Sequence, residues 1–123
     1  ATTKIPARME HWQKIIAHAC SQCGRSIIPT IHPPTTFKEW IINNTDYIKM
    51  ILTPESSTTI TTLTITNPVG LMIGPEGGFS AEEIAWAILH QCIAVSLGPR
   101  VLRTETAGIV AMTGIQMQFG DLR

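Results

Sequence analysis

The chain has 123 residues, of which 44% are hydrophobic and 15% charged, and nine basic residues balance nine acidic ones. This length predicts one domain with its own core, and the composition argues against a disordered chain. The lack of net charge argues against a domain that holds nucleic acid by charge alone, because phosphate contacts dominate such binding. No apolar run is long enough to span a membrane and no signal peptide is evident, so we expect no membrane partner.

The cysteines do not form a metal-binding pattern. Cys20 and Cys23 make one C-x-x-C, but a second Cys or His pair at zinc spacing is missing. We therefore expect no metal, and we interpret Cys20, Cys23 and Cys92 as free thiols. An odd number of free thiols is typical of a reducing compartment, which predicts a cytoplasmic protein.

The first half of the chain predicts two helices and two strands. Residues 7–22 have apolar side chains on one stripe, as in an amphipathic helix, and Gly24 is expected to end it. The elements expected next are a short irregular strand over 27–31, a helix capped by Thr36, and a strand over 47–52 that exits into Thr53-Pro54-Glu55.

In the second half, the apolar run Val69–Ile73 predicts a buried strand, and Ser80 with Glu83 forms a capping box for the helix that follows. The other expected elements are a Ser/Thr-rich surface loop over 56–67 that could hold a short strand over 60–65, a helix over 81–90, a strand over 92–97, and a helix capped by Thr104 that runs to Phe119. This last helix is apolar on more than one side, which indicates burial on one side and a partner subunit on the other.

The alternation of helices and strands predicts an α/β fold, with a mostly parallel sheet and helices on both faces. Two strands exit into loops marked by glycine and proline, residues 74–78 and 98–103. Parallel strands place their exits at one edge, so these loops and Thr53-Pro54 could ring one pocket. Glycines there expose main-chain groups that suit polar readout of an adenine edge. The loops match neither G-x-G-x-x-G nor Walker A, and no G-x-S-x-G is present.

Two stretches, Leu71-Met-Ile-Gly-Pro-Glu-Gly-Gly-Phe-Ser80 and Leu97-Gly-Pro-Arg-Val-Leu-Arg-Thr-Glu-Thr-Ala107, resemble the SPOUT methyltransferases. Together with Arg8-Met-Glu-His-Trp-Gln-Lys14, Cys20-Ser-Gln-Cys-Gly-Arg25 and Phe119-Gly-Asp-Leu122, they look most like the ribosomal RNA small subunit methyltransferase E family. That family methylates N3 of a uridine in 16S ribosomal RNA. The resemblance spans nearly all of the chain. We expect residues 1–123 to be the catalytic domain, without the PUA-like RNA-binding domain that precedes it in the family.

The resemblance also implies a trefoil-knotted domain, a homodimer, the small ribosomal subunit with its 16S rRNA as partner, and S-adenosyl-L-methionine held by main-chain groups of the knot loops. Carried over residue by residue, the cofactor-binding set is Ile73, Gly74, Pro75, Glu76, Gly77, Gly78, Leu97, Gly98, Val101 and Leu102, with Thr53 and Pro54 as weaker candidates.

Uridine N3 is nucleophilic only once it has lost its proton, so a base or an anion-stabilising cation is needed. Arg103 is the leading catalytic candidate, because its guanidinium can hold a uracil carbonyl or a phosphate. Glu105 is the base, or it orients Arg103, or it is only a favourable residue in a first helical turn. Glu76 is either reactive or shapes its loop, and Arg100 touches RNA or only solvent.

Two alternatives to this function stay open. The first is a SPOUT enzyme that acts on another RNA base or on a sugar hydroxyl. The second is a non-catalytic RNA-binding or dimerisation module that retains the cofactor pocket.

Overall fold

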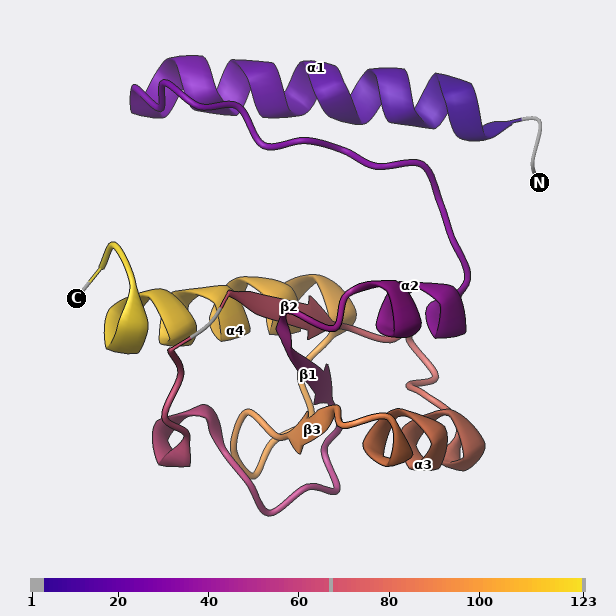
Figure 1. Ribbon diagram of the computed structural model, residues 1–123. Helices are drawn as coiled ribbons and strands as arrows, with labels where there is room; N and C mark the ends of the chain where they lie inside the picture. The colour runs from indigo at the N-terminus through magenta and orange to yellow at the C-terminus, as the bar shows by residue number, and fades with distance from the viewer. Residues whose placement is uncertain (1–3, 67, 123) are drawn as a thin grey trace. The chain divides into compact units, whose positions relative to one another are not determined.

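The computed structural model describes residues 4–66 and 68–122. The chain divides into two compact units, Ala1–Thr35 and Thr36–Arg123. The first unit contains helix α1 (Ile5–Cys23), which is drawn in indigo and violet in Figure 1. Gly24 ends α1 in the left-handed conformation, with φ of 77°, and its N–H donates to the carbonyl of Cys20. The predicted first helix and its glycine stop are thus confirmed.

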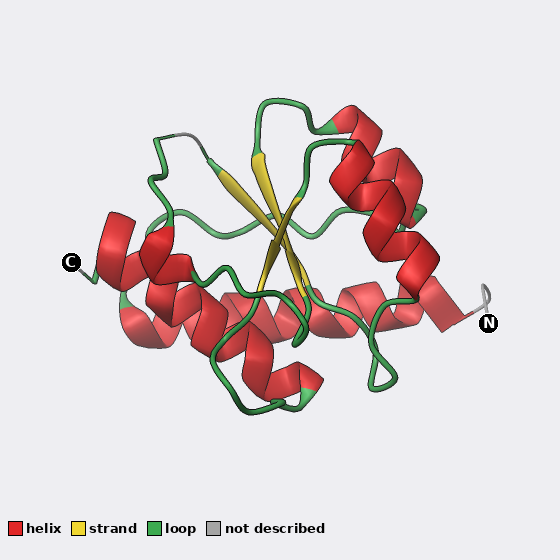
Figure 2. Ribbon diagram, turned by 90° about the horizontal axis from the view of Figure 1, so that it is seen from below, coloured by secondary structure: helices red, strands yellow, loops and turns green. Residues whose placement is uncertain are grey.

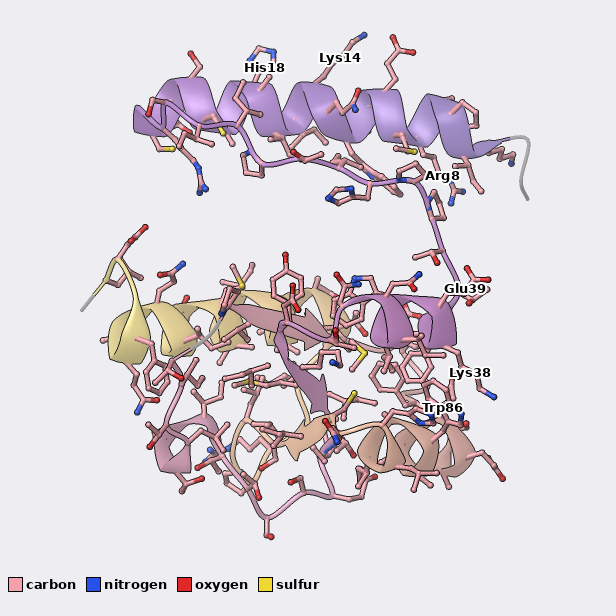
Figure 3. The ribbon with its side chains drawn as sticks, in the orientation of Figure 1. Arg8, Lys14, His18, Lys38, Glu39 and Trp86 are labelled. Atoms are coloured by element: carbon pink, nitrogen blue, oxygen red, sulfur yellow. The ribbon has the colours of Figure 1, made fainter. Side chains whose placement is uncertain are left out.

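Residues 24–35 contain no strand, so the strand predicted over 27–31 is wrong. Pro29, Pro33 and Pro34 lack the N–H that a strand donates to its neighbour, which favours an irregular segment. Figure 3 shows Arg8, Lys14 and His18 on α1, and all three side chains are exposed. These three polar side chains therefore face solvent.

The second unit is built on a three-stranded parallel sheet in the order β2-β1-β3. Strand β1 (Ile48–Leu52) lies in the middle and pairs in parallel with both β2 (Val69–Met72) and β3 (Ile93–Val95). Figure 2 shows the three strands in yellow. The predicted parallel sheet is confirmed, and the carboxyl ends of all three strands share one edge.

Helices cover both faces of this sheet, as predicted. Helices α2 (Phe37–Asn43) and α3 (Ala81–Leu89) pack on one face, and α4 (Thr104–Phe119) packs on the other with the 3₁₀ turn η2 (Ile60–Thr62). Alternate residues of each strand point to opposite faces, which produces two core clusters. The buried residues of the first are Ile41, Ile51, Met72, Ala87 and Cys92; those of the second are Met50, Ile60, Val95 and Ala111.

The starts of α2 and α3 are set by their caps. The Thr36 hydroxyl accepts from the N–H of Glu39 at 3.2 Å. The Ser80 hydroxyl accepts from the N–H of Glu83 at 3.1 Å, and the Glu83 carboxylate accepts from the N–H of Ser80 at 2.8 Å. Both caps, including the capping box, were readable in the sequence and are confirmed.

Aromatic side chains fill the space between α2 and α3. The Phe37 and Phe79 rings lie 5.5 Å apart between centroids, and Phe37 and Trp86 lie 6.3 Å apart. The ammonium of Lys38 lies 5.2 Å from the centroid of the Trp86 ring; both side chains are labelled in Figure 3. These contacts fix the position of α3 and hence the loop that leads into it from β2.

Two further local predictions differ from the structure. Residues 60–62 form the turn η2 and residues 63–65 are irregular, so the strand predicted over 60–65 is wrong. Thr104 is the first residue of α4 and does not cap it; Arg103 is the N-cap, without a side-chain capping bond.

Helix α4 is buried on one side only. Ala107 and Ala111 are buried, whereas Ile109, Val110, Met112 and Met117 are exposed. Among the described residues, no helix combines the length and the apolar character needed to cross a membrane.

Candidate functional site

A cavity of about 510 Å³ lies at the edge of the sheet where the three parallel strands end. Its lining comes from the exits of β1 and β2, from the end of β3, and from the loop and first turn that lead into α4. The size falls within the range of small-molecule sites, roughly 300–1,000 Å³. The predicted pocket at the strand exits is therefore present, with the three expected loops around it.

Most of the residues expected to bind a cofactor line this cavity: Thr53, Pro54, Ile73, Gly74, Pro75, Glu76, Gly78, Leu97, Val101 and Leu102. Gly77 and Gly98 do not belong to the lining. A Cβ on Gly77 would meet no heavy atom within 4 Å, and Gly98 has φ of 105°, which suits the shape of its turn. Arg103 and Glu105 both line the cavity.

Arg100, which was expected to touch RNA or only solvent, lines the cavity. Five other lining residues were not named as site residues from the sequence: Leu52, Val95, Ser96, Thr104 and Ala107. Leu52 ends the strand predicted over 47–52, and Val95 and Ser96 lie close to the end of the strand predicted over 92–97, so a position near the strand end was the available signal. Thr104 and Ala107 belong to the first turn of α4, and only the docking of that helix against the sheet brings them to the cavity.

The loop after β2 is closed tightly on itself. A Cβ on Gly74 would lie 3.2 Å from the carbonyl carbon of Gly78 and 3.2 Å from the nitrogen of Phe79. The N–H of Gly78 donates to the carbonyl of Pro75 at 2.8 Å, and Gly78 has φ of 76°. Close approach favours glycine at 74 and the positive φ favours it at 78, so these two positions contribute only main chain to this wall of the cavity.

The loop after β1 is held to β3. Thr53 is buried, and its N–H donates to the carbonyl of Val95 at 2.9 Å. Its hydroxyl donates to the carboxylate of Glu55. This bond, followed by a backbone hydrogen bond at Glu55 itself, lowers the pKa of the Glu55 carboxyl below its ordinary value of 4.5. The Ser56 hydroxyl donates to the carbonyl of Ala94 at 2.8 Å, so the loop is tied to β3 at two points.

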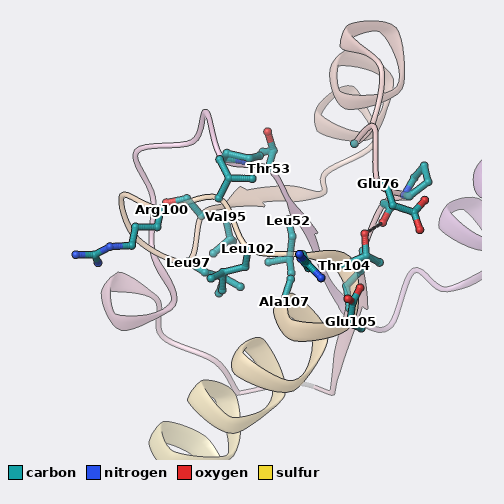
Figure 4. A pocket seen from close by; sticks show the side chains of 18 residues that line it. Leu52, Thr53, Glu76, Val95, Leu97, Arg100, Leu102, Thr104, Glu105 and Ala107 are labelled. Atoms are coloured by element: carbon teal, nitrogen blue, oxygen red, sulfur yellow. Dashed lines mark hydrogen bonds between the residues drawn. The ribbon is translucent and has the colours of Figure 1, made fainter.

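Charged side chains of both signs surround the cavity. Figure 4 shows the Arg100 side chain directed away from Glu76 and Glu105. Arg103 and Glu105 are exposed, and neither makes an ion pair or a side-chain hydrogen bond within the described part of the chain. Both are therefore available to a molecule bound in the cavity.

The amino end of α4 also faces the cavity, since Thr104, Glu105 and Ala107 all line it. The first N–H groups of a helix have no partner within the helix, and the helix dipole favours negative charge there. The site thus combines apolar walls and main-chain loops with the amino end of α4, where negative charge is favoured. No cluster of three or more metal-ligating side chains occurs among the residues described.

Comparison with known proteins identifies the family. The sequence matches the RNA methyltransferase domain over residues 2–116. The ribosomal RNA small subunit methyltransferase E of Buchnera aphidicola subsp. Schizaphis graminum is 42% identical over 120 residues, which are 96% of this chain and 49% of that protein. The enzyme of the same name from Bacillus subtilis is 28% identical over 98% of this chain and 51% of its own length.

Two solved structures show the same fold. A methyltransferase from Legionella pneumophila, in complex with bound cofactor SAM, has a TM-score of 0.93 and 43% identity, over 98% of this chain and 50% of its own. A ribosomal RNA small subunit methyltransferase E from Neisseria gonorrhoeae, bound to S-adenosyl methionine, has a TM-score of 0.92 and 30% identity, over 98% of this chain and 52% of its own.

The chain spans about half the length of the relatives that it matches. The sequences of the two glycine-marked loops predicted that the chain is an RNA methyltransferase domain. The family match confirms this prediction and covers both loops. This chain belongs to the RNA methyltransferase domain family.

Proposed function

We propose that this chain is the catalytic domain of an enzyme that uses S-adenosyl-L-methionine to methylate N3 of a uridine in 16S ribosomal RNA. The observation that carries the proposal is the cavity at the common exit of the three parallel strands. Its loops have the sequences by which the chain resembles the family, and similar structures were solved with this cofactor bound.

The residues present fit such a cofactor. Leu52, Val95, Leu97 and Leu102 offer apolar side chains against which an adenine ring can pack. Gly74 and Gly78 line the cavity and bring their main-chain groups to this wall without side chains of their own. When bound, S-adenosylmethionine supplies an electrophilic methyl group on a sulfonium centre.

The chain's own residues then act on the uracil. Arg103 donates to a uracil carbonyl or to a neighbouring phosphate and stabilises the negative charge that develops as N3 loses its proton. The amino end of α4, at Thr104 and Glu105, favours the same charge. Glu105 serves as the proton acceptor, because its exposed carboxylate lines the cavity without a partner among the described residues. Holding N3 in line with the methyl group supplies a large part of the rate, by orientation alone.

A homodimer belongs to this proposal. Ile109, Met112 and Met117 on α4 are 70%, 52% and 59% exposed, although the opposite side of the same helix is buried. A second copy that covers these side chains would remove them from water. The trefoil knot implied by the resemblance is part of the same proposal.

The test uses two steps. Calorimetry with S-adenosylmethionine asks whether this chain binds the cofactor. Transfer of a labelled methyl group to 16S rRNA or to small ribosomal subunits, by the full-length protein, then asks for the reaction, and mass spectrometry of the nucleosides identifies the product. Formation of 3-methyluridine supports the proposal. A different modified nucleoside points to another RNA methyltransferase, and cofactor binding without transfer points to a non-catalytic module.

A further inference from the structure

We propose that Thr104 is a positioning residue for methyl transfer: its hydroxyl ties the glycine loop after β2 to the first turn of α4. This inference rests on the proposed function. It goes beyond the expected site, because Thr104 was expected only to cap α4. The bond would set the distance between the loop that holds the cofactor and the two residues, Arg103 and Glu105, that act on the uracil.

The hydrogen bond itself joins two distant parts of the chain. Thr104 Oγ1 donates to the carbonyl oxygen of Gly74 at 3.0 Å, and the two residues are 30 positions apart. Both residues line the cavity, and Figure 4 shows the bond as a dashed line at Thr104. Because the N-cap of α4 is Arg103 and makes no side-chain capping bond, the Thr104 hydroxyl serves this contact and not the helix terminus.

A second contact on the same side of α4 supports the tie. Gly108 lies four residues after Thr104, so both face the same neighbour. A Cβ on Gly108 would lie 3.0 Å from Cδ1 of Ile73, the residue before Gly74. The first two turns of α4 therefore rest directly on the exit of β2, once through a hydrogen bond and once through a close approach that glycine permits.

The consequence falls on the neighbours of Thr104. Arg103 and Glu105 stand directly before and after it, and both are exposed without ion pairs or side-chain hydrogen bonds within the described residues. Their placement at the cavity is set by the backbone of α4, which the Thr104–Gly74 bond holds to the cofactor loop. Loss of the hydroxyl would let the two sides of the cavity separate while each element stays folded.

The variants for the test are Thr104→Val, which keeps the shape and removes the hydroxyl, and Thr104→Ser, which keeps the hydroxyl. The matched control is Thr113→Val. Thr113 lies on the same helix and its hydroxyl donates to the carbonyl of Ile109 at 2.8 Å, but it is exposed, joins only neighbouring turns and lies away from the cavity. It reports the effect of a Thr→Val change on α4 itself.

For Thr104→Val we expect a weaker affinity for S-adenosylmethionine by about 2- to 10-fold, the value of one hydrogen bond. Turnover by the full-length enzyme at saturating cofactor should fall further, by roughly 10- to 100-fold, because misplaced reacting groups are costly. Without cofactor, amide exchange of Gly78, whose N–H bonds to Pro75, should accelerate. Thr104→Ser should restore all three quantities, and Thr113→Val should leave them unchanged.

The outcomes separate the two proposals. A wild-type protein that binds no S-adenosylmethionine would overturn the proposed function, and the positioning role with it. A wild-type protein that binds and turns over normally, beside a Thr104→Val variant with the same KM, kcat and exchange, would overturn the positioning role alone. Failure of Thr104→Ser to rescue would do the same, because the hydroxyl would then not be the group that matters.

Discussion

Two glycines on helix α4 allow a stringent test of how this helix docks. Gly108 and Gly114 both lie inside the helix, where glycine costs about 1 kcal/mol relative to alanine. Their surroundings differ: a Cβ on Gly114 would lie 3.7 Å from Cδ1 of Ile60, an ordinary contact, whereas a Cβ on Gly108 would lie 3.0 Å from Cδ1 of Ile73. Alanine at the two positions should therefore have unequal effects.

For Gly114→Ala, we expect the free energy of unfolding to rise by about 1 kcal/mol, because the gain in helix propensity meets no steric cost. For Gly108→Ala, the Ile73 side chain must move, and an off-rotamer position costs about 0.5–1.5 kcal/mol. This cost cancels the gain, so the free energy of unfolding should stay close to the wild-type value. Because Ile73 lines the cavity, only Gly108→Ala should also weaken the binding of S-adenosylmethionine.

Urea unfolding followed by circular dichroism measures this difference. With a slope of about 1–3 kcal/mol per molar urea, Gly114→Ala should raise the midpoint by about 0.3–1 M, and Gly108→Ala should not. Equal stabilisation by both substitutions, with unchanged cofactor affinity, would refute the close contact between α4 and the exit of β2.

The other predictions concern charge and reactivity. Arg103→Ala should leave the affinity for S-adenosylmethionine within a few-fold, yet abolish methyl transfer in the full-length enzyme; unchanged turnover would reject its role. The pKa of Glu55 is lowered mainly by the hydrogen bond from the Thr53 hydroxyl. The contribution of this hydrogen bond to folding stability is therefore present above pH 4.5 and is lost as the pH falls through the lowered pKa. Thr53→Val should move that pKa back toward 4.5 in an NMR titration, and an unmoved pKa would contradict the bond. Burial raises the pKa of the Cys92 thiol above 9.0, and Lys49 has a smaller, opposing effect. At pH 8 a thiol reagent should therefore label the exposed Cys23 well before Cys92. Equal labelling rates of Cys23 and Cys92 would argue against that burial.

The elements that sequence reasoning identified correctly are those with local signals. The Ser80–Glu83 capping box, the Thr36 cap and the glycine stop at Gly24 each depend on residues within a few positions of one another. The parallel sheet followed from the order of apolar and helical segments, which is also a property of the linear chain. Once three strands were expected to end at one edge, the location of the cavity followed.

Apart from the strand expected over 27–31, which its prolines disfavour, the errors arose where distant contacts decide the outcome. Residues 60–65 carry β-branched side chains, but Ile60 packs under α4 and the segment turns there instead of pairing as a strand. The local sequence predicts Thr104 as the cap of α4, but its hydroxyl donates to the carbonyl of Gly74, 30 residues away. Gly77 resembles its glycine neighbours in the sequence, and only the path of the loop leaves it outside the cavity lining.

The central claim is that the cavity at the strand exits holds the cofactor, and an amide chemical-shift map during titration with S-adenosylmethionine tests it most directly. We predict saturable shifts at Thr53, Gly74, Gly78, Leu97 and Leu102, and none at the smaller groove lined by Val69, Met112 and Phe119. Shifts centred on that groove, or no shifts at millimolar cofactor, would contradict the account.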